Sequence, residues 1–130
     1  MGVIVSGRII KVGGYAFSVT EVIPASNGRS LSGVHHDLGV TPDLIVGFTD
    51  TSFSSVSNDD IQAFVAGRTY KDSTTWNNMV ARCSGSAQNF RPVLSGLSSI
   101  SASETDISVT TSNYWFRGGI PYYIIAVAIE

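Results

Sequence analysis

Short runs of β-branched and aromatic residues recur along the whole chain, and no window keeps the apolar period of an amphipathic helix. Gly, Pro, Asn and Ser clusters separate these runs at intervals of roughly 8–15 residues, which is typical of strands joined by turns. The pattern predicts an all-β antiparallel sandwich of about 7–9 strands. We expect a single domain over residues 1–130. The one alternative is a short helix in "SNDDIQAFVAG" (57–67), where Asn58 would be the N-cap.

The beginning of the chain predicts a β-hairpin. "VIVSGRIIKV" (3–12) and "YAFSVTEVI" (15–23) flank Gly13-Gly14, and glycine adopts the positive φ of a tight turn without steric cost. Residues 1–12 are also an expected docking arm, because an extended segment can add a strand to the sheet of a partner.

Two of the runs predict which surfaces are buried. On one face the run 15–23 carries Tyr15, Phe17, Val19 and Glu21. We expect this face to meet the core, because its side chains are larger and mostly apolar. The run "IPYYIIAVAI" (120–129) is apolar on both faces. It should therefore lie in the centre of a sheet or be covered by another subunit, since an exposed edge of this kind would aggregate.

The most patterned stretch is "HHDLGVTPDLIVGF" (35–48). Its turn motif consists of His36, Gly39, Pro42 and Asp43. Pro42 fixes its own φ and extends the residue before it, Gly39 can take positive φ, and Asp43 can bond the backbone around the turn. The motif predicts a kinked entry into a strand over 44–48.

The two histidines are the obvious candidates for a metal site, but the pattern disfavours one. Adjacent residues at the end of a strand point to opposite faces, so His35 and His36 make a poor chelating pair. The chain has no third histidine and only one cysteine, whereas zinc needs further ligands. We expect no metal, unless a symmetry axis gathers one histidine from each of several subunits.

Composition narrows the classes of function. The formal net charge is −2, and only 14% of residues are charged. With no basic cluster, we expect neither a nucleic-acid partner nor insertion into or binding to a membrane. One cysteine excludes an internal disulfide. The chain lacks a nucleophile elbow and a phosphate-binding loop, and its carboxylate pairs, Asp59-Asp60 and Glu104 with Asp106, fall in polar turns. We therefore expect no enzyme and no cofactor.

Two segments resemble a module of bacteriophage virion proteins, especially tail-fibre tips and capsid-attached fibres. They are "HDLGVTPD" (36–43), followed by "LIV", and "TDISVTTSNYWFRGGIPYYIIAVAI" (105–129). The similarity extends loosely over residues 34–130. The chain also resembles H-type lectin domains, which are sandwiches that assemble as trimers and bind sugars at subunit boundaries. The resemblance implies an H-type lectin-like or jelly-roll-like sandwich.

The function that this resemblance implies is structural. We expect a non-enzymatic subunit of the virion: a capsid decoration protein, a head-fibre subunit or a fibre tip. Such a protein would be made in the host cytoplasm and would act by self-assembly, as a trimer by resemblance. Its partners would be copies of itself and the major capsid or tail proteins.

The alternative is a carbohydrate-binding module that recognises the host surface. Aromatic rings stack on sugars, and the candidates for this role are Trp76, Tyr70, Tyr114, Trp115 and Tyr122. Trp76, between "STT" and "NN", is expected to lie in an exposed loop. The competing interpretation is that "SNYWF" (112–116) supplies core aromatics and an interface anchor.

Overall fold

The structure, a computed structural model, describes residues 3–49, 60–84 and 89–129. This part of the chain holds ten strands and no helix. They are β1 (Val3–Val12), β2 (Tyr15–Ile23), β3 (Ser30–His35), β4 (Leu44–Phe48), β5 (Asp60–Arg68), β6 (Trp76–Ser84), β7 (Asn89–Leu94), β8 (Leu97–Ala102), β9 (Asp106–Thr111) and β10 (Tyr122–Ile129). The helix considered for 57–67 does not form over its described part, which belongs to β5; residues 57–59 lie outside the described ranges.

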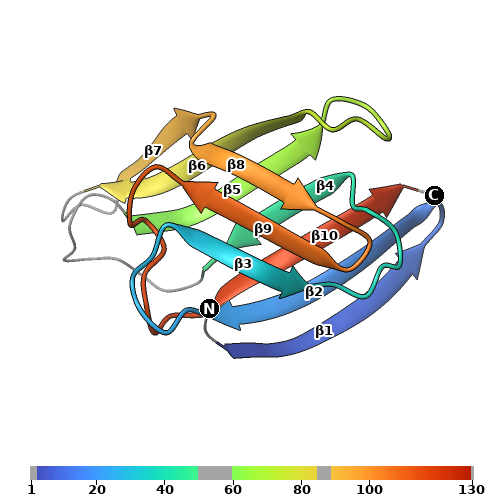
Figure 1. Ribbon diagram of the computed structural model, residues 1–130, viewed down its shortest axis with the longest axis horizontal. Helices are drawn as coiled ribbons and strands as arrows, with labels where there is room; N and C mark the ends of the chain where they lie inside the picture. Colours follow the sequence, from blue (N-terminus) through green and yellow to red (C-terminus); the bar gives the residue numbers. More distant parts are fainter. Residues whose placement is uncertain (1–2, 50–59, 85–88, 130) are drawn as a thin grey trace.

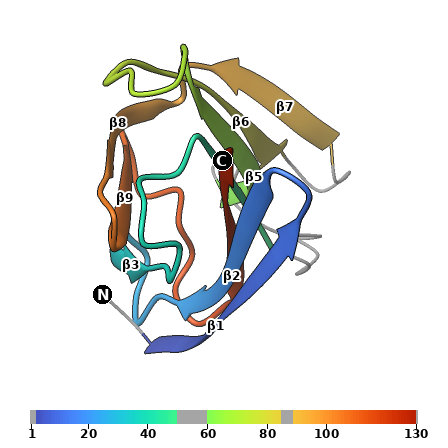
Figure 2. The same cartoon turned by 90° about the vertical axis from the view of Figure 1, so that its right-hand side faces the viewer.

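Two antiparallel sheets face each other (Figures 1 and 2). The larger has seven strands in the order β1-β2-β10-β4-β5-β6-β7, and the smaller has three in the order β3-β9-β8. The prediction of an all-β antiparallel sandwich is confirmed. The predicted hairpin is present as β1 and β2, and the predicted central position of the last run is correct, because β10 pairs with β2 and β4.

The core fills the space between the sheets. Rings of Phe64, Phe116 and Tyr122 pack edge to face, with centroids 6.2 and 5.5 Å apart along the series. Around them lie aliphatic side chains from both sheets, such as Ile45 and Val109, which are no more than 1% exposed. Burial of these side chains is the main favourable contribution to the packing of the two sheets.

The face of β2 that meets the core is not the one predicted. The buried residues are Ala16, Ser18, Thr20 and Val22, whereas Tyr15 is 50% exposed. Small side chains suit the inner face because β2 passes close to the end of β3, where the Thr20 hydroxyl donates to the His35 carbonyl oxygen at 2.9 Å. The larger side chains therefore point away from the smaller sheet, which leaves an apolar surface outside.

Candidate functional site

The turn motif forms the entry into β4 as predicted. Gly39 has φ +73°, and a β-carbon there would have open space around it, so the positive φ explains the glycine. Pro42 is buried. Asp43 then precedes the first residue of β4, Leu44.

Asp43 joins three strands through its backbone and its carboxylate. Its N–H donates to the Val127 carbonyl oxygen at 2.7 Å, and its own carbonyl oxygen accepts from the Arg68 N–H at 3.0 Å. Oδ1 accepts from Nη2 of Arg68 at 2.6 Å, and Oδ2 accepts from the Ile129 N–H at 2.8 Å. The side chains of Arg68 and Asp43 are only 9% and 10% exposed, respectively. Asp43 thus fixes the ends of β4, β5 and β10 against one another.

The environment of Asp43 favours its charged form. Burial by itself would raise the pKa of the carboxyl, but the hydrogen bond from the Ile129 amide and the guanidinium of Arg68 outweigh it, with a smaller contribution from Lys71. The net result is a lowered pKa, so the Asp43–Arg68 ion pair persists through the neutral range.

The two histidines lie on opposite faces, as predicted. His36 is 2% exposed; its Nε2 contacts the Ser103 carbonyl oxygen at 2.9 Å, and its Nδ1 accepts from the Leu38 N–H at 3.3 Å. His35 is exposed and contacts Asp37 at 2.9 Å and Asp106 at 3.6 Å. His36 therefore buttresses the turn. Among the described residues, no group of three or more His, Cys, Asp or Glu side chains could hold a metal ion.

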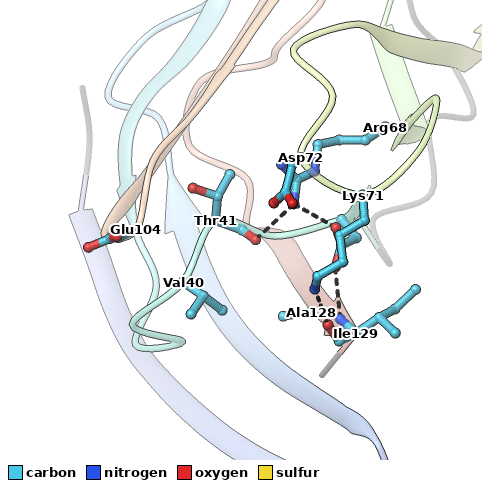
Figure 3. Close-up of a pocket in the computed structure, with 9 residues that line it drawn as sticks. Val40, Thr41, Arg68, Lys71, Asp72, Glu104, Ala128 and Ile129 are labelled. Atoms are coloured by element: carbon cyan, nitrogen blue, oxygen red, sulfur yellow. Dashed lines mark hydrogen bonds and ion pairs between the residues drawn. The ribbon is translucent and has the colours of Figure 1, made fainter.

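A cleft of about 580 Å³ opens beside the Asp43–Arg68 pair, and we call it the charged cleft. It is lined by Val40, Thr41, Asp43, Arg68, Lys71, Asp72, Glu104, Ala128 and Ile129. In Figure 3, Arg68, Lys71 and Asp72 lie on one side, and Glu104 lies across from them. The Lys71 ammonium donates to the Ile129 carbonyl oxygen at 2.6 Å. The cleft offers both hydrogen-bond donors and acceptors, with nearly balanced charge.

Two smaller clefts adjoin it through Arg68, and each contains one of the predicted aromatic residues. Trp76 lines a cleft of about 290 Å³ that also includes Asp72. It is the first residue of β6 and packs partly against the core, so the prediction of an exposed loop position is wrong. Tyr70, 70% exposed, lines a cleft of about 300 Å³. We call this second one the apolar cleft.

The remaining aromatic candidates lie elsewhere. Trp115 is 7% exposed beneath the Arg82 guanidinium, 4.3 Å from the ring centroid, and Tyr122 is fully buried. Neither ring has a face free for a sugar, so both are corrected to core residues. Tyr114 is 58% exposed, with the Arg29 guanidinium 4.8 Å from its ring centroid. The sequence cannot distinguish these neighbours, because the turn after β9 sends one ring inward and the other outward.

A second buried acid, Asp60, lies near the core residue Tyr122. Asp60 is paired with Arg117 at 3.2 Å, and burial raises the pKa of its carboxyl despite that cation. Burial also raises the pKa of Tyr122 to about 12; its hydroxyl accepts from the Arg117 N–H at 3.1 Å. Asp59, the other half of this carboxylate pair, lies outside the described residues. The prediction that these acids lie in polar turns is correct for Glu104, which is exposed between β8 and β9. It is wrong for Asp60 and Asp106, which are the first residues of β5 and β9, although Asp106 is exposed.

The seven-stranded sheet has a second apolar surface, on the side that faces away from the smaller sheet, and this surface was not predicted from the sequence. Directly paired residues form one apolar row across six strands: Val19, Ile125, Val46, Val65, Met79 and Leu94. Their chain neighbours Ile124, Ile45 and Val80 point into the core, so the row points outward.

The rows on either side of this one are also largely apolar. One pairs Phe17, Val127 and Leu44; the other pairs Tyr123, Phe48, Ala63 and Ala81, with Glu21 at the β2 end. Antiparallel sheets with one solvated face normally alternate between apolar and polar residues. We call these three rows, with Tyr15 and Ile129 beyond them, the outer face. The apolar residues on both faces of β10 are the sequence feature from which the outer face could have been predicted.

Comparison with models of known families, with curated proteins and with solved structures returned no match. In the ranges that the structure describes, no helix is long and apolar enough to cross a membrane.

Proposed function

We propose that this protein is a non-enzymatic structural subunit of a bacteriophage virion that acts by self-assembly and attachment to the particle. The observation that carries the proposal is the outer face. Monomeric proteins seldom expose continuous apolar patches of more than a few hundred Å², and larger patches mark interaction surfaces. A sheet that is apolar on both sides is what a subunit needs when another chain forms its third layer.

The chemistry of the described residues points in the same direction. The two buried acids are held in structural ion pairs, Asp43 with Arg68 and Asp60 with Arg117. The turn motif that resembles phage fibre and decoration proteins acts as a brace between strands. These features favour packing and display over catalysis, and they fit a capsid decoration, head-fibre or fibre-tip subunit.

The experiment that tests this proposal is immunogold labelling of purified particles from the phage that encodes the chain, with an antibody raised against the recombinant protein. We expect label at regular positions on the head or at the fibre tips, and the chain should be found by mass spectrometry of washed particles. Particles that carry neither the label nor the chain would contradict the proposal.

A second candidate function, carbohydrate recognition, is favoured by the arrangement around Arg68. Two of the predicted aromatic residues, Trp76 and Tyr70, lie in clefts on two sides of it, and the charged cleft between them joins donors to acceptors. Nearly balanced charge suits a neutral ligand rich in hydroxyl groups better than a strong anion. Sugar sites commonly combine ring stacking with such polar groups.

A glycan array tests the second candidate. We expect the wild-type protein to bind a subset of neutral glycans and the binding to be lost in Asp72→Asn and weakened in Tyr70→Ala. Tyr114→Ala is the matched control, because Tyr114 is also an exposed aromatic residue but lies outside these clefts. Binding to no glycan, or equal loss in the control, would reject a sugar site at Arg68.

A further inference from the structure

The two ends of the outer face differ in shape. At one end, the rings of Phe48 and Tyr123 lie side by side, with centroids 5.5 Å apart. At the other end is the apolar cleft, whose lining includes Leu44, Val127 and Tyr70. The row through Val46 and Ile125 lies midway, two residues from Phe48 and two from Leu44 along β4.

The same two ends carry opposite charges. Glu21 is paired with Tyr123 in the register of β2 and β10, so it lies at the aromatic end. Lys71 lines the apolar cleft and is hydrogen-bonded to the Ile129 carbonyl oxygen at the opposite end of β10. The face thus has an aromatic pair with an acid at one end, and a hollow with a base at the other.

We propose that two copies of this chain pack outer face to outer face around a two-fold axis that lies in the plane of the contact and crosses the strands at the Val46–Ile125 row. This symmetry reverses the ends of the partner. The Phe48–Tyr123 pair of each copy then meets the apolar cleft of the other, and Glu21 comes within reach of Lys71 of the partner subunit, twice in the dimer. The inference rests on the self-assembly part of the proposed function and names its partner and geometry.

General features of sheet packing support this geometry. Two sheets pack about 10 Å apart with strands within about 30° of each other, as in a sandwich core. A two-fold interface is self-complementary, because the same patch serves both subunits. The outer face meets that requirement through its unlike ends. A three-fold axis parallel to the strands would instead bring like ends together.

Several large apolar side chains on the outer face are exposed. Tyr15 and Ile129 are about half exposed, Phe48 and Met79 more than a third, and Tyr70, beside the apolar cleft, is 70% exposed. A standard interface buries a continuous patch on each partner, and these side chains lie along adjoining rows of one sheet face.

The charge around the face does not favour a different occupant. Surfaces that bind membranes combine an apolar face with many Lys and Arg residues, whereas the whole chain has only eight. Glu21 and Lys71 carry opposite charges at the two ends, whereas Arg8 of β1 continues the middle row beyond Val19. The opposite ends favour a partner with the reverse arrangement, and a second copy of the chain provides it.

Charge reversal tests the proposal by sedimentation equilibrium of the full chain over a range of concentrations. We expect the wild type to form a dimer. Glu21→Lys and Lys71→Glu should each raise the Kd of the dimer by about tenfold, because like charges then face each other. The double reversal should return the Kd to near the wild-type value. Ser99→Lys, an exposed position on β8 of the smaller sheet, is the control and should leave the Kd unchanged.

The outcomes separate this inference from the proposed function. A dimer whose Kd is insensitive to the reversals, or is not restored by the double variant, would overturn the proposed geometry. A trimer would overturn the two-fold axis but leave self-assembly in place. A protein that remains monomeric at high concentration would overturn both, whereas the particle-labelling experiment bears on the virion assignment alone. Circular dichroism of each variant confirms that the fold is retained.

Discussion

At the residue scale, single side chains explain why positions of the same type are not equivalent. Gly47 in β4 packs directly against the Phe64 ring, so a β-carbon would overlap it, whereas a β-carbon at Gly67 in β5 would make only an ordinary 3.6 Å contact with Leu44. His36 and His35 differ in the same way, because one is enclosed and the other is exposed. In the sequence the two glycines of this comparison look alike, as do the two histidines, and only the packing distinguishes the members of each pair.

We expect Gly47→Ala to lower the free energy of unfolding by about 2 kcal/mol, because the added methyl group forces the Phe64 ring out of its position in the core. Urea unfolding followed by tryptophan fluorescence measures the change. Gly67→Ala is the matched control and should be neutral or slightly stabilising, since alanine is less flexible in the unfolded chain. Equal losses in the two variants would show that Gly47 is not in close contact with the ring.

His36→Phe should lower the free energy of unfolding by about 2 kcal/mol, because the Leu38 N–H and the Ser103 carbonyl oxygen both lose their partner. The same substitution at His35 removes only exposed polar contacts with Asp37 and Asp106, which contribute less than about 1 kcal/mol. Thermal unfolding of the two variants measures the difference. A larger effect at His35 would reverse the assignment of the two side chains.

At the scale of elements, the sequence predicted strands and turns well, but not which face of a strand is buried. The Gly13-Gly14 hairpin, the kinked entry at 36–43 and the central β10 are all local patterns, and all three are present. The assignment for β2 failed because it took large size and apolar character as the marks of a buried side chain. Inside this sandwich Ser18 and Thr20 fit close to the smaller sheet, and Phe17 does not.

The candidate site was predictable only in part, for a related reason. Asp43 was recognised from its turn, but its ion-pair partner Arg68 comes from the end of β5, 25 residues later. No local pattern in the sequence links them. Trp76 and Tyr70 were named for their chemistry, and it is the antiparallel pairing of β4, β5 and β6 that brings them to the two sides of Arg68.

The Asp43 brace predicts a dependence of stability on pH. Since the folded pKa of Asp43 lies below its ordinary value of 3.8, the brace stabilises the fold fully above that pH and loses its effect as the pH falls through the lowered folded pKa. Asp43→Asn should therefore cost about 3 kcal/mol at neutral pH, and the difference from wild type should shrink below pH 3.8.

Urea unfolding of both proteins between about pH 3 and 7 measures this difference. The comparison at equal pH removes the contribution of Asp60, whose raised pKa has the opposite sign. Asp37→Asn, at an exposed position, should show little change at any pH. A pH-independent difference for Asp43→Asn would mean that the carboxylate charge does not support the brace.

At the scale of the whole molecule, the sandwich has one core between its sheets and the apolar residues for a second contact outside them. The three-stranded sheet covers the inner face of the larger sheet, and no described element covers the outer face (Figure 2). The proposed assembly function follows from this asymmetry. The charged cleft beside Arg68 lies at one end of the same sheet and shares Lys71 and Ile129 with the apolar cleft, so a sugar bound at Tyr70 and the proposed dimer would compete for the same surface.

Hydroxyl-radical footprinting as a function of protein concentration tests whether the outer face is an assembly surface. We expect oxidation of Met79, Phe48 and Tyr15 to fall several-fold as concentration rises, while Tyr114, exposed but away from the outer face, stays equally reactive. If the outer-face residues react to the same extent at every concentration, or if Tyr114 is protected in their place, the outer face is not where the chain assembles.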